Sequence, residues 1–121
     1  MSADRRRTVW PARLYPGDVL VIEAMEALAL IAELPRRPVV TLARFAELDH
    51  DLLARFQPDC VVFPLFAQRL DATRVVRRLS ELGYRGNVCA LAPPLPDGAM
   101  VEAELRAVAP DLNLHLIDIP H

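Results

Sequence analysis

Lysine is absent from the chain, and all 14 of its basic residues are arginines. This absence excludes a Schiff-base lysine, a phosphate-loop lysine and a lysine general base. Hydroxyl nucleophiles are scarce as well, because serine occurs only as Ser2 and Ser80. We find no convincing pair of nucleophile and base. We therefore expect that the protein is not an enzyme.

Glycine and cysteine are also rare. The four glycines, at positions 17, 83, 86 and 98, are scattered and form no phosphate-binding loop. Cys60 and Cys89 lie inside apolar runs, without the spacing of metal ligands or of a disulfide framework. They are expected to be buried free thiols in a reducing compartment. The sequence thus predicts no metal and no cofactor.

Long apolar runs and a strong charge of either sign are missing too. The longest apolar segment, Val19 to Ala32, is broken by Glu23 and Glu26 and is shorter than the roughly 20 residues that span a bilayer. No signal-peptide stretch follows Met1, so a cytoplasmic location is expected. The net charge of −2 gives no field that would draw the protein to nucleic acid or to an anionic membrane.

What the chain does have is enough apolar sequence for one folded domain. It has 121 residues, of which 53% are hydrophobic and 25% are charged. Residues 1–17 are irregular by composition, and residues 18–121 carry short apolar runs that alternate with helical patterns. Strands are predicted at 18–23, 38–43, 59–63, 87–91 and 112–117. Helices are predicted at 24–34, about 47–56, 71–82 and 97–108.

This alternation predicts an α/β fold with a five-stranded parallel sheet that is doubly wound, with helices on both faces. The helix at 71–82 has the clearest pattern, because its apolar residues recur at helical spacing. Asp71 is expected to cap this helix and Gly83 to end it, while Arg74, Arg77 and Arg78 take the solvent side.

The stretch PDCVVFPLFAQRLDATRVVRRLSELGYRGNVCALAP, residues 58–93, resembles the receiver domains of two-component response regulators. The resemblance extends by pattern over about residues 18–120. It implies a flavodoxin-like sheet with strand order 2-1-3-4-5. It also implies a place in bacterial signal transduction.

The reactive positions of that family are replaced here. Pro64 stands at the phospho-accepting aspartate, Ala92 at the Ser or Thr after the fourth strand, and Ile119 at the lysine. Of the acidic pair that holds Mg²⁺ in the family, only Glu23 is present, because Ala24 stands at the other position. Aspartyl phosphorylation needs a carboxylate nucleophile, a bound cation and a positive group near the phosphoryl oxygens. The resemblance therefore implies a degenerate receiver.

The first predicted helix, AMEALALIAEL, is apolar on nearly every side and needs cover all round. In receivers a last helix shares its sheet face, and that helix is expected to be missing here, because the given sequence ends soon after the fifth strand. The segment that carries Trp10, a second chain, or both together would then supply the cover. We expect a symmetric homodimer at this helix, with Leu28, Ile31 and Trp10 as interface residues.

The sequence therefore predicts a phosphorylation-independent, receiver-like module that binds protein partners. One alternative is an active phosphorelay receiver in which Asp59 or Asp71 accepts the phosphoryl group. Another is a small-ligand or nucleotide sensor in the crevice at the carboxyl ends of the strands.

Overall fold

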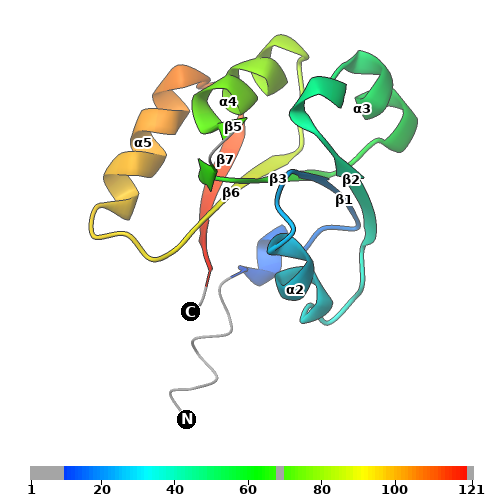
Figure 1. Cartoon of the computed structure of the whole chain (residues 1–121), viewed down its shortest axis with the longest axis horizontal. Coiled ribbons are helices and arrows are strands. Elements are labelled where there is room, and N and C mark those ends of the chain that lie inside the picture. The colour runs from blue at the N-terminus through cyan, green and yellow to red at the C-terminus, as the bar shows by residue number, and fades with distance from the viewer. Residues whose placement is uncertain (1–9, 68–69, 120–121) are drawn as a thin grey trace.

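Five parallel strands form the central sheet, in the order β2-β1-β3-β6-β7 (Figure 1). The computed structural model describes residues 10–67 and 70–119. The strands are β1 (Asp18–Ile22), β2 (Val39–Ala43), β3 (Cys60–Pro64), β6 (Asn87–Ala92) and β7 (Asn113–Asp118). Numbered within this sheet, they have the predicted order 2-1-3-4-5. The α/β class is confirmed, and the topology is consistent with a flavodoxin-like fold.

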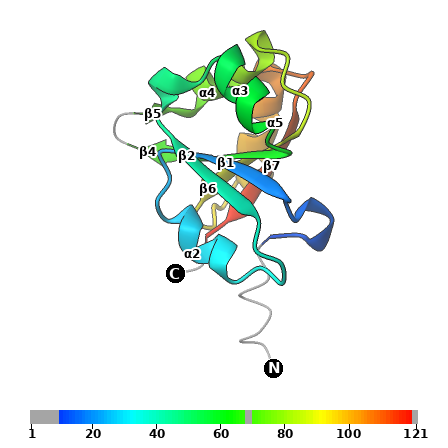
Figure 2. The same cartoon turned by 90° about the vertical axis from the view of Figure 1, so that its right-hand side faces the viewer.

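Helices cover both faces of the sheet, as Figures 1 and 2 show. The 3-10 helix η1 (Ala12–Leu14) and α2 (Ala27–Ala32) lie on one face. On the other face lie α3 (His50–Phe56), α4 (Ala72–Glu81) and α5 (Gly98–Val108). The described residues contain no helix that combines the length and the apolar character of a membrane crossing.

The middle of the sheet is buried on both sides, which explains why its strands are apolar almost throughout. All five residues of β3 are buried, as are the last five of β6. Side chains from alternate positions enter two separate cores. Leu20 and Val61 face the core under α3, α4 and α5, whereas Val19 and Val62 face the core under η1 and α2.

Helix α4 begins and ends where its sequence predicts. The Asp71 carboxylate accepts a hydrogen bond from the Thr73 N–H at 2.9 Å, which satisfies a free donor of the first turn. Val75, Val76 and Leu79 are fully buried. The chain leaves the helix at Gly83, whose φ of +72° favours glycine.

Helix α2 is shorter than predicted. The Ala27 and Leu28 N–H groups bond to carbonyls three residues back, and so do those of Glu33 and Leu34. These tight turns at both ends leave only residues 27–32 in α-helical geometry. Pro35 then prevents the helix from continuing.

A two-stranded antiparallel sheet, β4 (Phe66–Ala67) with β5 (Leu70–Asp71), was not predicted. Its strands have two residues each, too few for an alternating pattern to be recognised in the sequence. The hairpin connects β3 to α4.

The segment that carries Trp10 packs onto the sheet face it shares with α2. Trp10 is 3% exposed and Leu14 is 6% exposed, and both belong to the core under η1 and α2. The Trp10 indole N–H donates to the Leu14 carbonyl at 3.0 Å, which closes the segment on itself. The sequence indicated the Trp10 segment and a second chain as possible covers for this sheet face. In the structure the Trp10 segment packs there.

Candidate functional site

The fold brings the receiver-like positions to one edge of the sheet, because parallel strands all end there. Glu23 follows β1, Pro64 ends β3, Ala92 ends β6 and Ile119 follows β7. Ala24 and Ala92 are each 1% exposed, and Pro64 is buried. This edge is lined mainly by apolar groups.

Main-chain pairing continues past the strands at this edge. The Leu65 N–H donates to the Leu91 carbonyl and the Ile119 N–H to the Ala92 carbonyl, both at 2.7 Å. These bonds occupy backbone groups at the edge where ligands of open α/β sheets usually bind.

Glu23 supports the loop after β2. Its φ of 51° redirects the chain at the end of β1, and its carboxylate accepts a hydrogen bond from the Phe45 N–H at 2.8 Å. Phe45 begins the 3-10 helix η2 (Phe45–Glu47), so the contact holds this loop against β1. Within residues 10–67 and 70–119, no three His, Cys, Asp or Glu side chains are grouped as metal ligands would be.

The two aspartates of the phosphorelay alternative lie elsewhere. The Asp59 carboxylate precedes β3, at the opposite edge of the sheet, and accepts from the Gly17 N–H at 2.9 Å. Asp71 caps α4. Both carboxylates therefore satisfy backbone donors.

The cysteines are free and buried, as predicted from their apolar surroundings. The Cys60 and Cys89 sulfurs lie 3.7 Å apart on neighbouring strands. The hydrogen bond with Cys89, and then burial, raise the pKa of the Cys60 thiol. The thiol stays protonated near neutral pH, so Cys60 is a poor nucleophile.

The three residues expected at a dimer interface differ in their exposure. Trp10 and Ile31 are 3% and 5% exposed, so the single chain already covers them. Leu28 is half-buried, and only it reaches the surface. Met25, which precedes α2, is more exposed than any of these three residues, at 68%.

Strand β2 forms an open edge of the sheet with apolar side chains in solvent. Figure 2 shows β2 across the front of the molecule, between α3 above and α2 below. Val39 is 65% exposed, Val40 36% and Leu42 52%. Natural edge strands are usually protected by charges, bulges or prolines; Val39–Ala43 itself contains none of these, and Pro38 stands directly before it.

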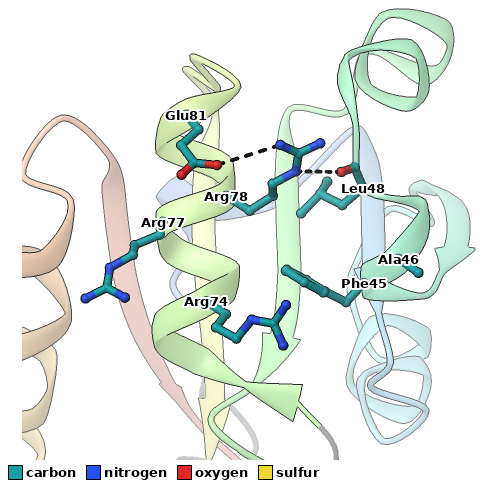
Figure 3. Close-up of a pocket in the computed structure, with 7 residues that line it drawn as sticks. All are labelled: Phe45, Ala46, Leu48, Arg74, Arg77, Arg78 and Glu81. Atoms are coloured by element: carbon teal, nitrogen blue, oxygen red, sulfur yellow. Dashed lines mark hydrogen bonds and ion pairs between the residues drawn. The ribbon is translucent and has the colours of Figure 1, made fainter.

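A pocket rich in arginine lies between α4 and the loop that follows β2 (Figure 3). Its volume is about 430 Å³. The lining residues are Phe45, Ala46, Leu48, Arg74, Arg77, Arg78 and Glu81.

Two of these arginines are held in place by uncharged groups. The Arg74 guanidinium lies 5.0 Å from the centre of the Phe45 ring, in a cation–π contact. The Arg78 Nε–H donates to the Leu48 carbonyl at 3.0 Å. Figure 3 shows both side chains extending toward the loop, whereas the Arg77 guanidinium points toward α5. The sequence assigned these arginines only to the solvent side of the helix. The spacing of Arg74 and Arg78 by four residues was the available signal for a shared face.

The chain matches no protein-family model, no curated protein and no solved structure. The geometry of the described residues is therefore the basis for a functional assignment.

Proposed function

We propose that the protein is a receiver-like interaction module that works without phosphoryl transfer and that binds a second copy of itself through β2. The observation that carries this proposal is the exposed apolar edge strand Val39–Ala43. We also propose that the protein belongs to the receiver family, acts in signalling and is located in the cytoplasm.

Backbone geometry supports β2 as a pairing edge. The Val39 N–H bonds to the Gly17 carbonyl and the Glu23 N–H to the Ala43 carbonyl, so residues 39 and 43 face β1. In a parallel ladder alternate residues bond to the same neighbour, and Val40 and Leu42 therefore direct their N–H and C=O groups away from β1. No described strand pairs with β2 on that side.

A second copy fits this edge because the edge is complementary to itself. In an antiparallel pair centred on Thr41, Val40 lies opposite Leu42 of the second copy. The outward-directed N–H and C=O groups of Val40 would then form two hydrogen bonds with those of Leu42 in the second copy. The two-fold axis of the dimer generates the same pair of bonds a second time. The two five-stranded sheets would then form one continuous sheet of ten strands.

Charge lies at the ends of β2, and none lies along it. Arg36 and Arg37 precede the strand, and Arg44 follows it together with Glu47. No like charges therefore oppose each other along the paired strands. The strand has only five residues. We therefore expect an association that depends on concentration.

Substitution of Leu42 by lysine tests the interface. The wild-type chain is expected to show a light-scattering mass that rises with concentration toward twice 13.5 kDa. Leu42→Lys should remain a single chain over the same range, because two copies would bring two lysines into an apolar interface. Met100→Lys is the matched control, since Met100 is 62% exposed and belongs to α5, a helix that lies far from β2 in Figure 1. Equal masses for the Leu42 and Met100 variants would contradict an interface at β2.

Absence of phosphoryl transfer needs its own measurement. After incubation with acetyl phosphate and Mg²⁺, intact-mass spectrometry under denaturing conditions should show no acid-labile phosphoryl adduct. Pro64 offers no nucleophile, and Glu23, Asp59 and Asp71 already accept backbone hydrogen bonds. A stoichiometric adduct that disappears in Asp59→Asn or Asp71→Asn would establish the phosphorelay alternative.

A sensor that uses the crevice at the strand ends remains the second alternative, and it has less support. The positions that would line it are mainly apolar, and their main-chain groups pair with each other.

A further inference from the structure

The arginine pocket beside α4 is unused by the interaction module proposed above. We propose that it binds the dianionic phosphate group of a small phosphomonoester, without any covalent step. The argument rests on the charge of the pocket, on how its arginines are held, and on its apolar floor.

The charge of the lining is positive. Arg74 and Arg78 extend toward the cavity, as Figure 3 shows, and Glu81 is the one acidic residue that lines it. The Arg78–Glu81 contact is 3.7 Å long, and the Glu81 side chain is 66% exposed, so this pair is a weak one. Arginine stays charged at every physiological pH. The pocket therefore attracts anions without needing a change in protonation.

Arg74 and Arg78 are positioned mainly by uncharged groups. The Phe45 ring orients one guanidinium and the Leu48 carbonyl fixes the other through its Nε–H alone. These partners carry no charge, and the terminal nitrogen Nη1 of Arg78 adds only the weak 3.7 Å pair with Glu81. Terminal nitrogens of Arg74 and Arg78 can therefore donate to an anion, and fixed donors lose little entropy when it binds.

A phosphate group suits two guanidinium groups better than a carboxylate does. Arg74 and Arg78 lie one helical turn apart on the same face of α4. One guanidinium can satisfy both oxygens of a carboxylate in a bidentate pair, whereas a phosphate group has further oxygens for a second donor. The pocket is also a single concave space of about 430 Å³, which favours a compact ligand over an extended acidic peptide.

The floor of the pocket is apolar. Phe45 and Leu48 pack partly or fully into the core, and Ala46 lies between them in the sequence. A phosphomonoester can therefore place its phosphate between the arginines and its organic part on this floor. Free phosphate would contact the arginines and leave the apolar floor empty.

Phenyl phosphate, inorganic phosphate and phenol are the probes that separate these contributions in isothermal titration calorimetry. We expect saturable binding of phenyl phosphate, weaker binding of inorganic phosphate, and none of phenol. Equal affinity for the two phosphates would assign the site to the free anion. Binding should weaken with added salt. It should also weaken below about pH 6, where a phosphomonoester takes up its second proton.

Four variants locate the site on the protein. Arg74→Gln and Arg78→Gln should each lower the affinity for phenyl phosphate about tenfold or more, as expected for the loss of a charge-assisted hydrogen bond. Arg78→Lys should fall between Arg78→Gln and wild type, because it keeps the charge and loses the planar fork. Arg13→Gln is the matched control, because it makes the same charge change in η1 on the opposite face of the sheet and should leave the affinity unchanged.

Circular dichroism and thermal unfolding of each unliganded variant establish that it folds. Absence of saturable binding to the wild-type chain would overturn the proposal. So would binding that both Arg74→Gln and Arg78→Gln leave unchanged. Saturation by a glutamate-rich peptide in place of phenyl phosphate would identify the pocket as a docking site for an acidic protein segment instead. Self-association through β2 is measured separately, so its outcome leaves this test unaffected.

Discussion

Gly86 lies where no side chain fits, although its backbone conformation is an ordinary one. A Cβ atom at this position would lie 2.2 Å from the Tyr84 hydroxyl oxygen and 2.7 Å from the Asp59 carbonyl oxygen. Tyr84 is 9% exposed, and its hydroxyl donates to the Pro58 carbonyl at 3.0 Å. The glycine thus lets the loop before β6 approach the start of β3.

Gly86→Ala is therefore expected to lower the free energy of unfolding by about 1–3 kcal/mol, the usual cost of overpacking. Gly98→Ala is the matched control, because its Cβ would meet only Leu116 Cδ2 at an ordinary 3.6 Å. Gly98 begins α5, where alanine favours the helix by up to about 1 kcal/mol. Urea unfolding followed by circular dichroism measures both changes. Equal free energies of unfolding for the two variants would show that the loop relaxes freely around Gly86.

The cover of the η1 and α2 face depends on one short segment. Trp10 and Leu14 lie over strand residues such as Val62 and Cys89 in the same core. Truncation of a buried tryptophan removes about 3–5 kcal/mol, a large part of the stability of a small domain. This segment is therefore an integral part of the fold.

Trp10→Ala should accordingly lower the free energy of unfolding by about 3–5 kcal/mol in urea titrations. Trp10→Phe should lower the free energy of unfolding by less, because phenylalanine keeps most of the buried apolar area. Its remaining cost includes the lost hydrogen bond to the Leu14 carbonyl. Tyr15→Ala is the control within the same segment, since Tyr15 is 39% exposed. A small effect of Trp10→Ala would mean that another cover, such as a second copy, protects this face.

At the scale of the whole molecule, the sequence predicted the sheet because the fold depends on local patterns. The apolar runs gave the strands, and alternation with helices gave the parallel order. The same topology correctly placed Glu23, Pro64 and Ala92 at one edge. Features set by long-range contacts were missed, such as the contact between Arg74 and Phe45 across the pocket.

The exposure of β2 was also missed, for a different physical reason. The run PVVTLA predicted a strand, but its apolar pattern does not say which of its side chains the neighbouring elements leave in solvent. The predicted strand order nevertheless puts it at an edge of the sheet, where only β1 is a neighbour. An apolar strand in that position is the basis for the proposed association.

Amide hydrogen exchange at residues 39–43, measured at low and high protein concentration, tests the central claim most directly. The Val40 and Leu42 amides point away from β1, so they should exchange quickly at low concentration and become protected as the concentration rises. The Val39 amide bonds to Gly17 within the chain and serves as the internal reference, protected independently of concentration. Protection of Val40 and Leu42 that stays the same across a concentration range in which the light-scattering mass increases would contradict self-association through β2.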